Sequence, residues 1–261
     1  MTAPSPSLSE SAVSGPVIEL SGVTKVFGTG RNELVALSNI DLDVAQGEIV
    51  CLVGTSGCGK TTILNIVAGL DKPTSGTVAT RGRPSLMFQE AALFPWLTVQ
   101  ANVELPLRLA GVGKAVRRQR AADLLDTVHL GGFGKRLPHQ LSGGMRQRVA
   151  MARAFAQDAD ILLMDEPFGA LDAMTRDSLH DELETLARTR GLTVLFVTHN
   201  VREAARLGDR IVVLSPRPGR VKATFDVDIP HPRRIESPEV SGLAGRVTDQ
   251  LRQEALIHAR S

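Results

Sequence analysis

The stretch Glu48–Leu70, EIVCLVGTSGCGKTTILNIVAGL, carries three successive patterns. Residues 48–53 are almost all apolar, which is typical of a strand buried on both faces of a sheet. A glycine-rich turn follows at 54–61, and TTILNIVAGL at 61–70 has the apolar spacing of a helix with a glycine near its end. The stretch therefore predicts a strand, a tight loop and a helix in direct succession.

The loop GTSGCGKT, residues 54–61, fits the pattern G-x-x-x-x-G-K-[ST]. Glycines let the backbone wrap a phosphate with its N–H groups inward, and the helix that follows presents its positive end to the same anion. Lys60 adds a charge for the β- and γ-phosphates, the Thr61 hydroxyl is placed to ligate Mg²⁺, and Thr62 can reach the α-phosphate. A chance match in a glycine-rich chain is the alternative, which the strand–loop–helix context disfavours. The predicted nucleotide-binding set is Gly54, Thr55, Ser56, Gly57, Cys58, Gly59, Lys60, Thr61 and Thr62.

A second strand pattern, ILLMDEP at 161–167, ends in two carboxylates. Four apolar residues bring Asp165 to the carboxyl end of that strand, beside the phosphate loop in folds of this kind. We predict that Asp165 holds Mg²⁺ through water and that Glu166 polarises the attacking water. Taken alone, an apolar strand ending in Asp-Glu is common, so this prediction depends on the phosphate loop upstream.

The segment LSGGMRQR at 141–148 predicts a second anion site. Ser142, Gly143 and Gly144 open a helix, so backbone amides and the helix dipole face an anion there as well. One chain has no obvious way to place two such helix starts on a single nucleotide. Two copies arranged head to tail would do so, each closing the nucleotide of the other. The alternative is a glycine-rich helix cap with basic flanks.

The remaining patterns predict a doubly wound α/β core. Short alternating runs between Val17 and Val44 indicate antiparallel strands with a turn near 28–32, and 161–165, 193–198 and 211–215 are buried-strand candidates. Helical patterns lie between them, around 172–190 and 201–207. Strands that alternate with helices favour a mostly parallel sheet.

The stretch from about Ala91 to Gln157 has weak strand signals and predicts helices at 98–110, 114–129 and 143–157. The end of the chain predicts one or two strands, a proline-rich turn and a helix near 239–258. We therefore predict a disordered tail at 1–16, an ATPase core formed by 17–90 and 158–219, a helical subdomain at 91–157 and an extension at 220–261.

Composition excludes several classes of protein. The 261 residues are 43% hydrophobic and 22% charged with a net charge of +2, too balanced to indicate a nucleic-acid partner from charge alone. The longest apolar run, Ile49–Val53, is far below the roughly 20 residues of a membrane span, and the first sixteen residues contain no basic or apolar stretch of a secretory signal. Cys51 and Cys58 form no disulfide or metal spacing, which favours a reducing cytosol.

With these motifs in place, the chain resembles the ATP-binding subunit of an ABC transporter from about Val17 to Gly219. In that family GTSGCGKTT is Walker A, LSGGMRQR the signature motif and ILLMDEP Walker B, and ALD at 170–172 matches the D-loop. His199 matches the switch histidine that contacts the γ-phosphate and positions Glu166, and Gln89 matches the Q-loop glutamine, which contacts Mg²⁺ and water. The resemblance implies a RecA-like P-loop ATPase core with a small antiparallel β subdomain and an inserted helical subdomain.

Two positions depart from the family pattern. Met145 stands where the signature commonly has Gln, although Ser142 and both glycines are kept. The family's adenine-stacking aromatic is often Tyr, and this chain contains none. Phe27 is the best substitute, because its ring can stack without a hydroxyl. The alternative is that Phe27 is simply a buried strand residue.

A finer resemblance comes from FQEAALFPWLTVQANVELPL at 88–107 and LSPRPGR at 214–220, together with the segments around the signature and Walker B. They look like the nitrate, sulfonate and taurine importer branch, whose ATPases pair with a separate permease and a periplasmic or lipid-anchored solute-binding protein. The apolar cluster 93–97 follows Gln89 and predicts a docking surface for the permease. Alternatively, Trp96 belongs to the core of the helical subdomain.

The resemblance implies an ATP- and Mg²⁺-dependent ATPase, working as a homodimer on the cytoplasmic face of the membrane and not on nucleic acid. Its implied catalytic residues are Lys60, Gln89, Glu166 and His199. A soluble ABC ATPase without a transport role remains an alternative, as does the cassette of an exporter or of a lipoprotein-release system. A GTPase or kinase is disfavoured because the signature motif would have no role in it. The transported solute is not encoded in this chain.

Overall fold

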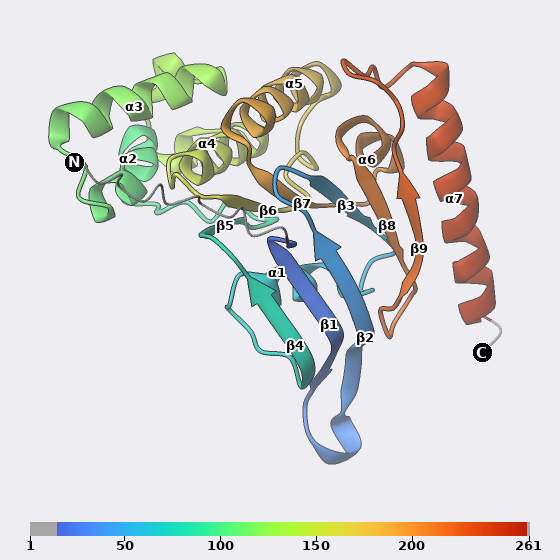
Figure 1. The fold of residues 1–261 in the computed structure, drawn as a ribbon. Helices are drawn as coiled ribbons and strands as arrows, with labels where there is room; N and C mark the ends of the chain where they lie inside the picture. The colour runs from blue at the N-terminus through green and yellow to red at the C-terminus, as the bar shows by residue number, and fades with distance from the viewer. Residues whose placement is uncertain (1–14, 260–261) are drawn as a thin grey trace, which may run out of the picture.

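The computed structural model describes residues 15–259 as a mixed α/β fold with two sheets (Figure 1). The predicted tail at 1–16 lies outside the described residues apart from Gly15 and Pro16. Within the described part of the chain, no helix combines the length and apolar character needed to span a bilayer.

The larger sheet has six strands in the order β5-β6-β7-β3-β8-β9. The first five are parallel and β9 joins the edge antiparallel to β8, which confirms the predicted mostly parallel sheet. Every residue of β3, β6 and β7 is buried, as expected for strands covered on both faces. The strand bounds are β3 Ile49–Val53, β5 Pro84–Met87, β6 Ile161–Asp165, β7 Thr193–Thr198, β8 Arg210–Leu214 and β9 Val221–Asp226.

The smaller sheet is antiparallel, in the order β2-β1-β4, with β1 at Ile18–Phe27, β2 at Leu34–Val44 and β4 at Ser75–Thr80. A short 3-10 turn at 30–32 connects β1 to β2, so the predicted hairpin is confirmed. The sequence did not predict β4 or β5. The first is largely exposed and contains glycine and two threonines, and the second has only four residues and begins with proline.

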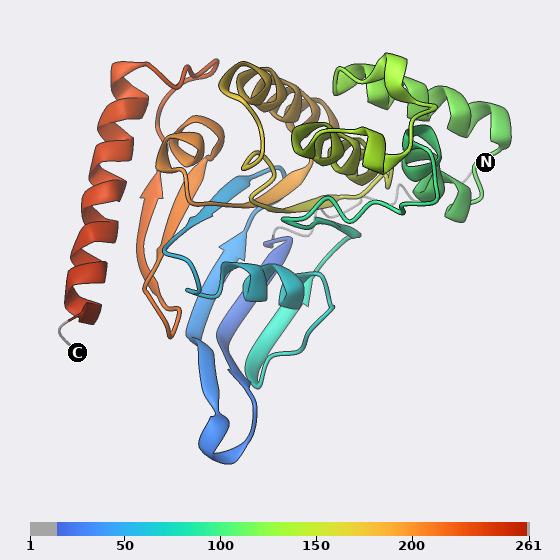
Figure 2. The same cartoon turned by 180° about the vertical axis from the view of Figure 1, so that it is seen from behind.

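Helix α1 lies between the two sheets, α4, α5 and α6 cover the opposite face of the six-stranded sheet, and α2 and α3 pack against α4 (Figures 1 and 2). Helix α7 runs beside α6 at the β8–β9 edge. Side chains of Thr98, Ser142, Asp172 and Asn200 cap α2, α4, α5 and α6 by accepting backbone N–H bonds. The helix bounds are α1 Lys60–Val67, α2 Val99–Leu109, α3 Lys114–Thr127, α4 Gly143–Phe155, α5 Ala173–Arg190, α6 Val201–Leu207 and α7 Pro238–Ala259.

The core consists of two apolar clusters, one on each face of the larger sheet. Alternate strand residues serve each face: Cys51 and Phe196 pack under α4 to α6, whereas Val50 and Leu195 pack against α1 and the smaller sheet. This double cover leaves the carboxyl ends of the parallel strands as the open edge where polar side chains can gather.

Candidate nucleotide site

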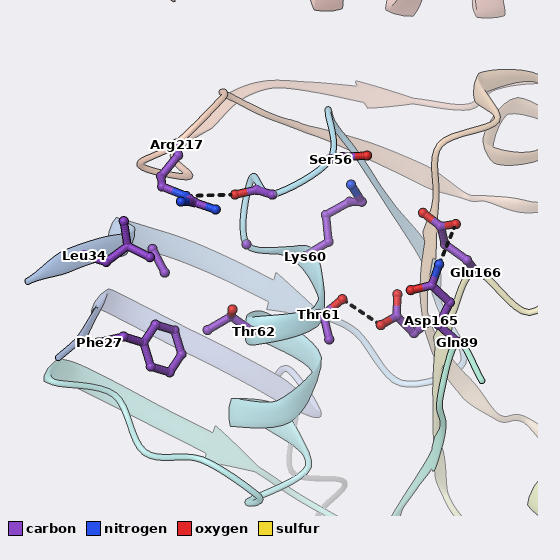
Figure 3. A pocket seen from close by; sticks show the side chains of 13 residues that line it. Phe27, Leu34, Ser56, Lys60, Thr61, Thr62, Gln89, Asp165, Glu166 and Arg217 are labelled. Carbon is purple, nitrogen blue, oxygen red and sulfur yellow. Dashed lines mark hydrogen bonds between the residues drawn. The ribbon is translucent and has the colours of Figure 1, made fainter. Parts of the chain in front are cut away.

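A pocket of about 300 Å³ lies where β3 ends and α1 begins (Figure 3). It brings together segments far apart in the sequence: the hairpin β1–β2, the loop 54–61, the segment after β5, the end of β6 and the β8–β9 turn. Its lining residues are Phe27, Leu34, Ala36, Ser56, Gly57, Gly59, Lys60, Thr61, Thr62, Gln89, Asp165, Glu166 and Arg217.

The loop before α1 needs glycine at its end. Gly59 caps the helix in a left-handed conformation (φ +96°), and a Cβ there would clash with the side chain of Leu37. With no side chain capping the helix start, its backbone N–H groups are available to an anion. The Lys60 ammonium is buried and donates to the carbonyl oxygens of Gly54 (2.8 Å) and Thr55 (3.1 Å).

Not every predicted loop residue lines the pocket. Gly54 and Thr55 do not line the pocket; their carbonyl oxygens accept hydrogen bonds from the Lys60 ammonium instead. The Cys58 thiol is buried in the core cluster beside α1, and this burial raises its pKa. Any contact between Cys58 and a nucleotide must therefore come from its backbone.

Thr61 and Asp165 meet at the floor of the pocket. The Thr61 hydroxyl donates to Asp165 Oδ2 at 2.7 Å (Figure 3). Burial raises the pKa of Asp165 and the neighbouring Glu166 carboxylate adds to the rise, while the Thr61 hydrogen bond and Lys60 partly offset it. The described residues contain no cluster of three or more His, Cys, Asp or Glu suited to a metal. A hydroxyl, one carboxylate and the nearby Gln89 amide nonetheless suit Mg²⁺, which commonly takes one or two carboxylates, water and phosphate oxygens.

Two of the predicted catalytic residues, His199 and Gln89, contact Oε2 of a third, Glu166. His199 Nδ1 lies 3.1 Å from it, and Gln89 Nε2 donates to it at 3.5 Å. Glu166 has a positive φ of +46°, unusual for a residue with a side chain, and its N–H donates to Val197 O of the adjacent strand. Strained backbone of this kind gathers at functional sites, where surrounding structure holds it.

The signature residues lie elsewhere. Ser142 caps α4 by accepting from Met145 N at 3.2 Å, and neither it nor Gly143 nor Gly144 lines the pocket. The structure of one chain therefore does not bring these residues to its own phosphate loop. Their predicted contact with nucleotide needs a second copy and stays a prediction.

Phe27 lies at the opposite end of the pocket from Glu166, with its side chain 41% exposed (Figure 3). The alternative that it is a buried strand residue is wrong. The Lys25 ammonium lies over the ring at 4.8 Å from its centroid and is itself paired with Asp71 at 2.5 Å. The position of the ring is compatible with stacking on a base.

Sequence reasoning missed Leu34, Ala36 and Arg217, which line the same end of the pocket. Arg217 Nε donates to Gly57 O at 3.4 Å. The turn that carries Arg217 is tied to β2, since Gly219 N donates to Ala36 O and Gly219 O accepts from Ser38 N, each at 2.9 Å. The motif LSPRPGR at 214–220 contains Arg217, but its position in the sequence does not indicate that it lies near the phosphate loop.

Comparison with known proteins matches residues 37–169, half of the chain, to the ABC transporter family. The chain belongs to this family. It is an ABC-type ATPase, and the match includes the phosphate loop, the signature segment and Asp165 with Glu166.

Curated relatives cover most of this ABC ATPase. An uncharacterized ABC transporter ATP-binding protein of Methanocaldococcus jannaschii is 44% identical over 247 residues, 92% of either chain. The taurine import ATP-binding protein of Burkholderia pseudomallei is 46% identical over 79% of this chain and 82% of its own length. The nitrate import ATP-binding protein of Synechocystis sp. is 42% identical over 82% of this chain and 83% of its own.

Solved structures agree with the fold. A dimeric ATP-binding cassette in a post-hydrolysis state, bound to ADP and Pi, superimposes with a TM-score of 0.76 at 37% identity. The match covers 81% of this chain and 99% of that one. That structure is a dimer and holds the products of ATP hydrolysis, and it supports a nucleotide site in this chain.

We expect Asp165→Asn to raise the melting temperature of the nucleotide-free protein at pH 7. Because burial raises the pKa of Asp165, folding favours its neutral form, so stability is lost as the pH rises past the ordinary pKa of 3.8 and the carboxyl ionises. Asparagine stays neutral and keeps an oxygen for Thr61. Differential scanning fluorimetry checks this, with the exposed Asp228→Asn as control.

The same variant should gain less from added MgATP than the parent protein, since one oxygen ligand for the metal is weakened. A melting temperature unchanged or lower without nucleotide would contradict the electrostatic argument.

Proposed function

We propose that this ATPase is the nucleotide-binding subunit of an importer for a small anion or organosulfonate, a nitrate-, sulfonate- or taurine-like solute. The observation that carries the proposal is the convergence of Gln89, Glu166 and His199 beside the phosphate loop. Two relatives named for taurine and nitrate import support the solute class.

In this proposal, Glu166 orients a water molecule for attack on the γ-phosphorus and takes its proton late in the reaction. The bond from water oxygen to phosphorus forms as the bond to the β–γ bridging oxygen breaks. His199 and Gln89 hold the carboxylate from two sides. Lys60 turns from the carbonyls of the loop to the phosphates, where its charge offsets that of the transferred group. Mg²⁺ bound near Thr61, Asp165 and Gln89 would neutralise phosphate charge.

Two copies pack head to tail in the proposed working state. Ser142, Gly143 and Gly144 of one copy then face the phosphates bound by the other, with the positive end of α4 behind them. A Cβ on Gly144 would lie 3.1 Å from Ala170 O, so within one chain the signature already packs on the D-loop segment 170–172. Both segments would meet the partner together.

The domain division proposed is a core of 17–90 and 158–219, a helical subdomain at 91–157 and an extension at 220–261. Helices α2 to α4 all fall within the helical subdomain. The extension begins with β9, which pairs with β8 and so continues the larger sheet before α7. We propose no separate role for α7 here.

The permease would dock on the loop 93–97, which displays aromatic side chains on a rigid support. Trp96 is 73% exposed and packs against Phe94 at 5.6 Å, so the alternative that it is a core residue is wrong. Buried Asn102 bonds to backbone atoms of Phe94, Leu97 and Thr98, which fixes the shape of the loop. An exposed aromatic surface on a fixed loop suits a protein partner.

The complete assembly in this proposal contains two ATPase copies, a membrane permease and a periplasmic or lipid-anchored solute-binding protein. The ATPase lies peripherally on the cytoplasmic face of the membrane, where the loop 93–97 reaches the permease. The solute is chosen by the other two components.

We expect Glu166→Gln to bind ATP with unchanged affinity, to lose most steady-state hydrolysis and to accumulate as an ATP-bound dimer. Glutamine keeps the shape but cannot take a proton. Phosphate release measures turnover, and size-exclusion chromatography measures the dimer. Exposed Glu19→Gln is the control, and full hydrolysis by Glu166→Gln would overturn the catalytic assignment.

Phe27→Ala should weaken ADP binding by about 1–3 kcal/mol, the usual contribution of base stacking. Affinity for inorganic tripolyphosphate, which has no base, should not change. Isothermal titration calorimetry measures both. Phe133→Ala removes a similarly exposed ring in another part of the chain and should leave ADP affinity intact. Equal losses for both phosphate ligands would rule out a stacking role.

Trp96→Ala should reduce co-purification with the permease while leaving ATP affinity and melting temperature unchanged, because its ring is exposed in the free chain. Leu109→Ala, at a comparably exposed apolar position, is the matched control. Undiminished recovery of the permease with Trp96→Ala would argue against docking at this loop.

A further inference from the structure

The His199 ring needs support that its own contacts do not provide. Its side chain is 67% exposed, and in the described part of the chain its ring is paired with Glu166. A catalytic contact must be held to within a fraction of an ångström. The position of His199 therefore depends on how its backbone is fixed on each side.

The residue before His199 is fixed by its hydroxyl. Thr198 is buried at the end of β7, and its Oγ1 donates to Glu203 Oε2 at 2.6 Å. The same oxygen accepts from Asn200 N at 2.9 Å. The Thr198 hydroxyl thus bonds the residue before His199 to the residue after it, Asn200.

The residue after His199 is fixed by the start of α6. Asn200 Oδ1 accepts from Arg202 N at 3.0 Å and from Glu203 N at 3.4 Å, which caps the helix that carries Glu203. Hydrogen bonds among Thr198, Asn200 and Glu203 thereby form a ring that fixes the backbone on either side of His199. The buried Glu203 carboxylate is part of this ring.

Glu203 is only 5% exposed, and the hydrolysis chemistry assigned above gives it no role. Arg176 Nε and His180 Nε2 from α5 lie 3.6 and 3.7 Å from its Oε1. Burial alone would raise the pKa of Glu203, but the nearby His180 ring, the Thr198 hydrogen bond and the charge of Arg176 outweigh it, so the pKa is lowered. A buried carboxylate held charged is costly unless well paired.

The other carboxylate oxygen of Glu203, Oε1, is connected to the D-loop segment through Arg176. Arg176 Nη2 donates to Leu171 O at 2.9 Å, while Arg176 Nε faces Glu203. Segments 170–172 and 198–200 are therefore linked through the Arg176 side chain and the Glu203 carboxylate.

We propose that Glu203 is a positioning residue for ATP hydrolysis: it holds Thr198 and, through Thr198 and Asn200, places the His199 ring against Glu166. This inference rests on the proposed function, because it assigns His199 a part in turnover. Glu203 itself does not touch the nucleotide.

The test is Thr198→Val, which removes the hydroxyl and keeps the shape. We expect kcat for ATP to fall about tenfold or more, with KM for ATP and the affinity for ADP within about twofold of the parent. Thr198→Ser, which restores the hydroxyl, should recover most of kcat. Thr193→Val is the matched control: it removes a buried hydroxyl that accepts from Gly47 N at 3.1 Å at the other end of β7.

Melting temperatures of all variants separate positioning from loss of stability. If Thr193→Val loses as much kcat as Thr198→Val, or if Thr198→Val keeps parental kcat, the proposal is wrong. Glu203→Gln, which keeps the size of the side chain, should lose less kcat when added to Thr198→Val than when made in the parent, since the Thr198–Glu203 contact is then already absent. An additive loss would also overturn it. Glu166→Gln is measured alongside: activity in that variant would defeat the proposed function instead.

Discussion

Parallel pairing of β3, β7 and β6 is the constraint on which the whole site depends. The register sets Val53 beside Thr198 and Val197 beside Asp165, so three chain segments leave the sheet at one edge. The phosphate loop follows the first, His199 the second and Glu166 the third. Because both faces of these strands are buried, a slip in register would exchange the side chains packed on the two faces and disrupt both apolar clusters. Packing of the core thus sets distances between catalytic groups.

Helix α4 connects this edge of the sheet to the surface loop that follows Gln89, through side-chain hydrogen bonds. Gln147 of this helix is buried and donates to Gln89 O at 3.2 Å, and Arg153, two turns further on, donates to the carbonyls of Ala91 and Ala92. The signature helix therefore holds the segment 89–92, which joins Gln89 to the aromatic loop 93–97. Movement of α4 would have to move this loop, which would give a physical route between the nucleotide site and the surface proposed for docking.

Sequence patterns predicted this architecture where a periodicity was strong. Strands β3, β6 and β7 are predominantly apolar and fully buried, and α6 at 201–207 was predicted with its observed bounds. Two kinds of feature could not be predicted. Strand β4 is stabilised by pairing with β1 rather than by its own apolar residues. Arg217 reaches the pocket only because β8 lies beside β3 and its turn bonds to β2. Long-range pairing of this kind leaves no local pattern.

The nucleotide-free site combines several arrangements that cost stability: a strained Glu166 backbone, a buried Asp165 carboxyl with a raised pKa, and a Lys60 ammonium bonded to carbonyls of its own loop. The last two would be relieved by different parts of a bound nucleotide and its metal. Phosphate oxygens suit Lys60, and a cation suits Asp165. Nucleotide binding should therefore stabilise this edge more than its contact area alone suggests. Neither phosphate nor a cation gives the Glu166 backbone (φ +46°) a reason to relax, which is consistent with its conformation being shaped for the reaction.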